Sequence, residues 1–79
     1  MYYVYILKSL NSDGYYIGHA KDLNIRLERH NDGKVRSTKS RRPWKVIYTE
    51  NFNTKQEAYR REKQIKSYKG GAAFKRLIK

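Results

Sequence analysis

The sequence predicts an α+β fold in which a three-stranded antiparallel sheet is flanked by helices, in the order β-β-α-β-α-α. Two runs of β-forming residues flank the turn-forming segment Asn11-Ser12-Asp13-Gly14, and this pattern predicts a β-hairpin. A third such run follows, and the other segments have helical caps and helical spacing. Because the first two strands form a hairpin, the sheet cannot be wholly parallel. A small antiparallel sheet covered by helices is therefore expected.

The hairpin strands are expected at Tyr2–Leu7 and Tyr15–Gly18, and the third strand at Trp44–Phe52. The first run is almost continuous in β-forming residues, which is typical of a strand buried on both faces. Side chains alternate between the two faces of a strand, so Tyr5 and Tyr16 on neighbouring strands can share one face.

Three helices are expected, and the first two begin at a residue with a capping function. Asp22 caps the first, and Thr54 with Glu57 forms a capping box at the start of the second. Glycines follow the first two helices, where a left-handed residue commonly ends a helix. The expected ranges are 22–30, 54–68 and 72–78.

Composition restricts the class of protein. Seventy-nine residues predict one domain, 1–79, with a small core. The absence of cysteine excludes disulfides and thiolate metal sites, and two histidines are too few for a three-histidine zinc site. There is neither an apolar run long enough to span a membrane nor a secretory signal, so the cytoplasm is the expected location.

The charge predicts a polyanionic partner. Nineteen Lys and Arg oppose seven Asp and Glu, and the net charge of +12 favours nucleic acid over a membrane surface. The segment 34–43 is basic, lacks apolar periodicity and is expected to be a loop. Its cations would contact phosphates, with affinity that falls with salt and little sequence discrimination; a merely solvated loop is the alternative. These cations are Lys34, Arg36, Lys39, Arg41 and Arg42.

Glu62 is an unexpected residue for its position. Helical spacing places it on one stripe with Ala58 and Ile65, a stripe that should face the core. An ionised carboxylate there is costly unless a cation faces it. A salt bridge to a neighbouring Arg or Lys and a bound metal ion both satisfy this requirement.

Four segments resemble those of the GIY-YIG nuclease superfamily, and the likeness spans essentially the whole chain. Tyr3-Val4-Tyr5 and Tyr16-Ile17-Gly18 are similar to the paired motifs that name it, although Tyr3 stands where the first motif has glycine. The segment Asp22–Asn31 resembles the helix with a functional arginine, here Arg26, and Arg60–Lys66 resembles the segment with a metal-binding glutamate, here Glu62. The closest likeness is to small stand-alone bacterial members.

This resemblance implies a metal-dependent endonuclease that hydrolyses phosphodiester bonds in DNA with one Mg²⁺ or Mn²⁺ ion. Such an enzyme would be selective for structure, such as branched, damaged or flapped DNA, rather than for sequence, unless a partner protein supplies targeting. Glu62 would bind the ion. Arg26 would hold the scissile phosphate, because a permanently charged planar donor suits that task.

The remaining roles follow from the same resemblance. Tyr5 would orient or deprotonate the attacking water, supported by Tyr16, and His30 would accept or relay a proton. Because a free phenol has a pKa near ~10, Tyr5 would need neighbouring positive charge to act as a base near neutral pH. His19 is expected among the nucleic-acid contacts. Glu62 is then expected to point into a concavity shared with Arg26 and Tyr5.

Other interpretations of these residues remain. Tyr5 and Tyr16 can be interpreted instead as ordinary core aromatics, and Arg26 as an ordinary cation on the helix surface. His30 can be interpreted as a residue that the helix dipole favours at a C-terminus. For the whole chain the alternatives are a non-catalytic nucleic-acid-binding module on the same scaffold and, less favoured, an RNA-associated basic protein.

Overall fold

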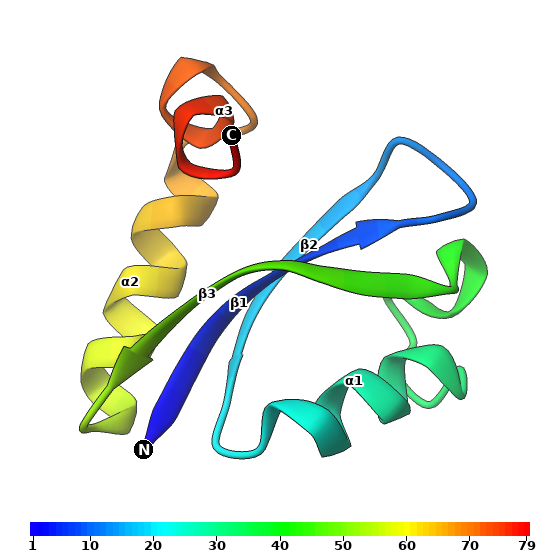
Figure 1. Ribbon diagram of the computed structural model, residues 1–79, viewed down its shortest axis with the longest axis horizontal. Coiled ribbons are helices and arrows are strands. Elements are labelled where there is room, and N and C mark those ends of the chain that lie inside the picture. Colours follow the sequence, from blue (N-terminus) through cyan, green and yellow to red (C-terminus); the bar gives the residue numbers. More distant parts are fainter.

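The order of elements is the predicted one. A computed structural model describes residues 1–79 and shows three strands and three helices in the order β-β-α-β-α-α (Figure 1). No helix is long and apolar enough to cross a membrane. The elements are β1 (Tyr2–Ser9), β2 (Tyr15–Ala20), α1 (Leu23–Asn31), the short 3₁₀ helix η1 (Lys39–Arg41), β3 (Trp44–Phe52), α2 (Lys55–Ser67) and α3 (Ala72–Leu77).

The sheet is antiparallel throughout, and β1 lies at its centre in the order β2-β1-β3. Tyr5 on β1 is paired with Gly18 on β2 and with Thr49 on β3. Four consecutive β1 residues, Val4–Leu7, are each 0% exposed. The central strand is therefore covered on both faces, as its nearly continuous apolar run predicted.

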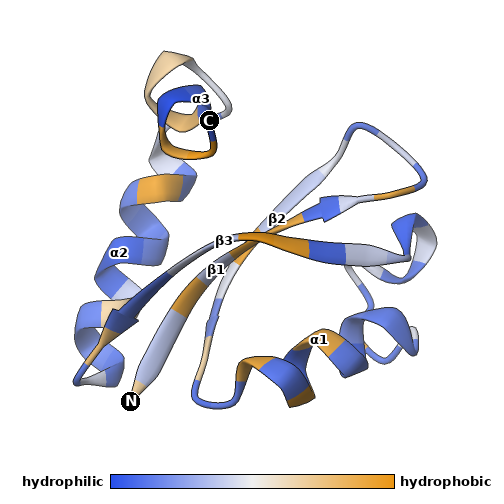
Figure 2. Ribbon diagram, in the orientation of Figure 1, coloured by the Kyte–Doolittle hydropathy of each residue, from blue (hydrophilic) through white to orange (hydrophobic).

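Two small cores lie on opposite faces of the sheet. Val4 and Ile6 pack with residues of α2 and α3, whereas Tyr5 and Leu7 pack with Trp44 and the apolar side of α1. Figure 2 shows the hydrophobic stretches of the strands where they cross between the helices. Because β1 side chains alternate between the two faces, each face of the sheet packs against its own layer of helix.

The predicted helix starts are confirmed. The Asp22 side chain accepts a hydrogen bond from the Ile25 backbone N–H at 3.0 Å, and Thr54 Oγ1 accepts one from the Glu57 N–H at 3.2 Å. On α2 the buried residues are Ala58, Glu62 and Ile65, the stripe that helical spacing predicted.

The basic segment 34–43 is anchored to the fold instead of lying free in solvent. Thr38 is fully buried, and its carbonyl oxygen accepts a hydrogen bond from Trp44 Nε1 at 3.0 Å. Ser9 Oγ donates to the Arg41 carbonyl oxygen at 2.6 Å, and η1 forms between these anchors. The sequence predicted a loop without helix here; the short 3₁₀ turn is the difference, and its cause is this set of long-range hydrogen bonds.

Ile65→Ala tests the core beneath α2. Ile65 is 0% exposed and packs in the cluster of Val4 and Phe74. Truncating a buried isoleucine to alanine costs about 2–5 kcal/mol of unfolding free energy, to be measured by urea denaturation. Ile25→Ala is the control, because Ile25 is 57% exposed, and its effect should stay below about 0.5 kcal/mol. Equal losses of stability in the two variants would contradict this description of the core.

Candidate active site

Gly18 allows the phenol of Tyr5 to lie across β2. The two residues are directly paired, and a Cβ at Gly18 would lie 2.7 Å from the Tyr5 Oη and 2.9 Å from its Cζ. Such distances are too short for any side chain at this position. Because β2 is one of the two edge strands, the Tyr5 hydroxyl lies toward the edge of the sheet although Tyr5 belongs to the central strand.

A buried chain of hydrogen bonds joins Tyr5 to the basic segment. His30 Nε2 lies 3.0 Å from Tyr5 Oη, and His30 Nδ1 lies 2.8 Å from Thr38 Oγ1. Thr38 Oγ1 donates its single proton to the Val35 carbonyl oxygen at 3.3 Å. It must then accept from His30 Nδ1–H, which leaves His30 Nε2 to accept from the Tyr5 hydroxyl. Thr38 therefore fixes the tautomer of His30.

Tyr16 completes a cluster of three rings on this face of the sheet. Its ring centroid lies 4.8 Å from that of His30 and 6.2 Å from that of Tyr5. The structure thus brings together Tyr5, Tyr16 and His30, three of the five residues predicted to be catalytic. Arg26 lies close enough for its charge to act on both Tyr5 and His30.

Burial and neighbouring charge keep Tyr5 and His30 neutral. Burial lowers the pKa of His30 from 6.5 to about 4, and the charges of Arg26 and Arg29 act in the same direction. Burial also raises the pKa of Tyr5 far above that of a free phenol, with Tyr16 adding to the rise and Arg26 opposing it. The positive charge expected to activate Tyr5 is present, but desolvation outweighs it. At neutral pH Tyr5 keeps its proton and donates it to a neutral His30.

Glu62 lies with His19, next to Gly18 on β2. Glu62 Oε1 is 2.5 Å from His19 Nδ1, and Glu62 Oε2 is 2.7 Å from Lys66 Nζ. The residue is 8% exposed. Both carboxylate oxygens are thus paired, and the salt bridge that helical spacing left as an alternative is present at Lys66.

The residues fit a metal ion held by a single carboxylate. No group of three His, Asp or Glu side chains could hold a metal ion by itself. A Mg²⁺ ion, however, commonly keeps several waters and takes one or two carboxylates together with substrate phosphate oxygens. Glu62 can supply that carboxylate if Lys66 turns away. The Lys66 side chain is 51% exposed and can reach solvent, whereas the Glu62 side chain is only 10% exposed and keeps His19 as its other partner.

Two neighbouring pockets lie at the end of β2 and the start of α2. One has a volume of about 310 Å³. It adjoins a second pocket of about 430 Å³, which also contains Gln56 and Tyr59, because both are lined by His19 and Lys55. We call the two together the β2 groove. The first pocket is lined by Tyr2, His19, Ala20, Lys21, Arg26 and Lys55.

The β2 groove differs in part from the expected concavity. Arg26 lines it as predicted, but His19 stands there in place of its partner Glu62, and Tyr5 does not line it. His19 was expected among the phosphate contacts; its hydrogen bond to Glu62 is a contact between residues 43 positions apart that no local pattern indicates.

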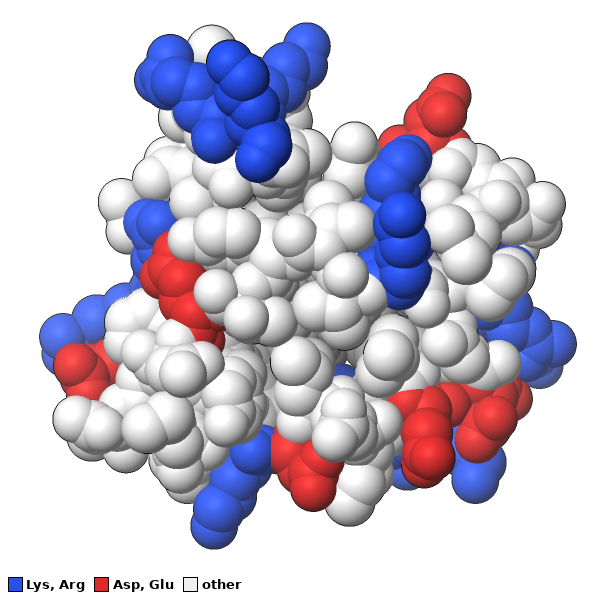
Figure 3. Space-filling model, viewed as in Figure 1, with Lys and Arg blue, Asp and Glu red and all other residues white.

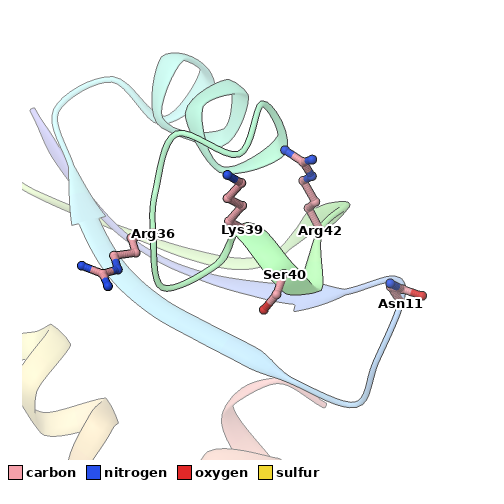
Figure 4. A pocket seen from close by; sticks show the side chains of 5 residues that line it. All are labelled: Asn11, Arg36, Lys39, Ser40 and Arg42. Atoms are coloured by element: carbon pink, nitrogen blue, oxygen red, sulfur yellow. The ribbon is translucent and has the colours of Figure 1, made fainter.

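The largest pocket lies on the basic segment, away from the ring cluster. It measures about 560 Å³ and contains three of the predicted phosphate-contacting cations, Arg36, Lys39 and Arg42 (Figure 4). Asn11 of the β1–β2 turn and Ser40 complete its wall. We call it the basic pocket. None of its three cations forms a salt bridge with a carboxylate, since the salt bridges involve only His19, Arg61 and Lys66.

The other two cations of the segment lie outside the basic pocket. The Arg41 guanidinium stands over the Trp44 ring at 5.5 Å, and Lys34 is exposed and lines no pocket. Positive side chains are not confined to this segment: on the face seen in Figure 3 they gather over α3 and at the margins, around a largely uncharged centre.

Comparison with known proteins shows the family to which this chain belongs. The GIY-YIG catalytic domain matches residues 1–73, and the chain belongs to this family. A UPF0213 protein of Staphylococcus epidermidis is 47% identical over 68 residues, which are 85% of this chain and 82% of that protein. A UPF0213 protein of Staphylococcus aureus is 49% identical over 69 residues, with the same coverage.

A solved structure extends the comparison to three dimensions. The solution structure of a UPF0213 protein from Bacillus halodurans matches with a TM-score of 0.50 and 34% sequence identity, over 84% of this chain and 70% of that one. The family implies a nuclease-type function, and its nucleases generally depend on a divalent metal and act on DNA.

His30→Gln tests the buried neutral imidazole. Between pH 6.5, the ordinary pKa of His, and about 4, the unfolded state binds more protons at this residue than the folded state does. The unfolding free energy of the wild type should therefore fall as pH drops through this window, and that of His30→Gln should fall less. Urea midpoints at pH 7, 6, 5 and 4 measure the difference. Parallel curves would contradict a buried neutral His30.

Proposed function

We propose that this protein is a divalent-metal-dependent endonuclease that hydrolyses phosphodiester bonds in DNA and recognises structure rather than sequence. The observation that carries the proposal is the buried chain Tyr5–His30–Thr38, which presents a phenol and an oriented imidazole beside Arg26. The cytoplasmic location stays a prediction.

In this mechanism Arg26 binds the scissile phosphate and stabilises the charge that develops on its oxygens. Tyr5 would accept a hydrogen bond from the attacking water on its oxygen, which is fully buried in the free protein, so the mechanism requires substrate binding to admit that water. As the water loses a proton to Tyr5, Tyr5 passes its own proton to His30 Nε2, so that hydroxide attacks phosphorus while the phenol stays neutral. The P–O bond to the leaving nucleotide oxygen breaks, and that oxygen takes a proton from solvent. Tyr16 packs against both rings and limits their movement.

Glu62 would hold the divalent ion, Mg²⁺ or Mn²⁺, with one of the oxygens that now faces Lys66 or His19. The ion supplies Lewis-acid polarisation of the phosphoryl group and charge neutralisation.

Phosphate contacts away from the reaction centre come from the basic pocket. Its lining contains three unpaired cations, one amide and one hydroxyl, and no carboxylate. Such a set recognises backbone phosphate and not base identity. The pocket is adjacent in sequence to the ring cluster, because Lys39 directly follows Thr38, which is hydrogen-bonded to His30.

One observation favours a second candidate, a non-catalytic module that binds nucleic acid. Both oxygens of Glu62 are already paired inside the protein, which would satisfy a carboxylate with no metal to bind. This candidate predicts salt-sensitive binding without turnover at any divalent ion concentration. The RNA-associated alternative predicts that RNA competes better than DNA.

Arg26→Ala and Glu62→Gln test the assigned roles. Loss of one charge-stabilising donor lowers the rate of such a reaction about 100- to 1,000-fold, and Glu62→Gln should remove metal-dependent cleavage to a similar extent. Labelled single-stranded, duplex, flapped and branched DNA are incubated with Mg²⁺ or Mn²⁺. Arg60→Ala is the control, because it removes an exposed cation of α2 outside the site. Equal residual cutting in all variants would indicate a contaminating nuclease and refute the assignment.

Arg36→Ala with Lys39→Ala tests the basic pocket. Removing a cation that binds a phosphate should reduce the slope of log K against log salt by about 1 per cation. The slope is measured by fluorescence anisotropy with labelled DNA in EDTA, so that nothing is cut. Lys75→Ala with Arg76→Ala on α3 removes the same charge elsewhere. If the slope falls equally in the two double variants, binding is a property of net charge and the pocket has no separate role.

A further inference from the structure

Tyr59 is an exposed aromatic residue whose position general packing does not explain. Of the eight tyrosines, only Tyr15 and Tyr59 are largely exposed, at 38% and 48%. Tyr15 packs edge-on against Phe74 of the core, with ring centroids 5.2 Å apart. Tyr59 instead meets His19, the partner of Glu62, edge-to-face at 5.9 Å. An exposed ring in contact with the candidate site is the feature to be explained.

His19 and Lys63 contact the Tyr59 ring, and about half of the residue stays exposed. Glu62 lies three positions further along α2, so Tyr59 and Glu62 are on adjacent turns of one side of the helix. Lys63 Nζ stands 5.4 Å from the Tyr59 ring centroid. The ring still lines the second pocket of the β2 groove, together with His19, Lys55 and Gln56.

The β2 groove has a different chemistry at each end. Arg26 and Lys21 line one end, which is suited to phosphate, and Tyr59 and Gln56 line the other, which offers an aromatic surface with an amide. No carboxylate lines either pocket. A nucleotide presents the same two chemistries, a phosphate and a flat base.

We infer that Tyr59 is a stacking platform for a nucleobase next to the phosphate that Arg26 holds. This inference rests on the proposed function, since it places the cut strand in the β2 groove. Stacking on an aromatic ring is tolerant of sequence because every base has a π-face. Gln56 and Lys55 offer hydrogen-bonding groups to the edge of such a base.

A stacking platform gives a physical basis for recognition of structure. A base in a duplex is already stacked and paired, and moving it onto Tyr59 costs a few kcal/mol, whereas an unpaired base moves at little cost. The groove should therefore favour strands with an unpaired nucleotide beside the bound phosphate. Tyr59 would set this preference while Arg26 and Glu62 carry out the chemistry.

A thermodynamic cycle tests the contact directly. Single-stranded DNA of about 16 nucleotides, the upper site size of one small single-strand-binding domain, is synthesised with one abasic site at each position in turn. Binding is measured by anisotropy in EDTA. One abasic position should weaken wild-type binding by roughly 5- to 100-fold, the range for removal of one base–aromatic stack. The same position should have no further effect in Tyr59→Ala.

Matched variants distinguish stacking of Tyr59 on a base from a role of Tyr59 in holding His19 in position. Tyr59→Phe should behave as the wild type, and Tyr59→Leu, which keeps bulk but no π-face, should behave as Tyr59→Ala. Leu10→Ala controls for removal of an exposed apolar side chain elsewhere, since Leu10 is 59% exposed in the β1–β2 turn. Equal binding by Tyr59→Leu and wild type, or no abasic position that depends on Tyr59, would overturn the inference.

The outcome is independent of whether the protein cuts DNA. A wild type that binds with a Tyr59-dependent abasic effect but never cleaves would refute the proposed nuclease and leave the stacking contact standing. If the wild type cleaves DNA while all Tyr59 variants bind equally, the proposed nuclease stands and the stacking contact is refuted.

Discussion

The hydrogen bond between Tyr5 Oη and His30 Nε2 organises the rest of the structure. It joins the central strand to the end of α1, and Thr38 extends it to the basic segment. All three residues are 0% exposed. A buried polar group left without its partner costs about 1–3 kcal/mol, so the helix end, the segment after it and the sheet hold one another in position. The same contact that stabilises this face also orients the phenol of Tyr5 and the imidazole of His30 toward each other.

The charge near this pair connects its protonation with the presence of substrate. Arg26 and Arg29 help to keep His30 neutral in the free protein. A phosphate bound at Arg26 would oppose that charge and raise the pKa of His30, so the imidazole becomes a better proton acceptor when substrate is in place. The imidazole of His30 would thus be a weak base in the free protein and a stronger base when a phosphate is bound at Arg26.

Local patterns in the sequence predicted the parts of the structure that depend on neighbours in sequence. The hairpin, the caps at Asp22 and Thr54 and the position of Glu62 on a buried stripe all follow from spacings of a few residues. The partners of Glu62 and His30 do not: His19 is 43 positions from Glu62, and Tyr5 is 25 from His30. The family resemblance gathered these residues, but it carried no signal for Thr38 or Tyr59. Nor could it show that desolvation raises the pKa of Tyr5.

The two halves of the site belong to different faces of the sheet, and two consecutive residues of the edge strand bring them together. Successive side chains of a strand point to opposite faces. Gly18 has no side chain, so Tyr5 lies across β2 on the α1 face, and His19 reaches Glu62 of α2 from the other. A larger residue at position 18 would displace Tyr5, and a shift of register by one would exchange the two faces. The Gly18-His19 step therefore sets how the phenol and the carboxylate lie relative to each other, on opposite faces of the sheet at one of its edges.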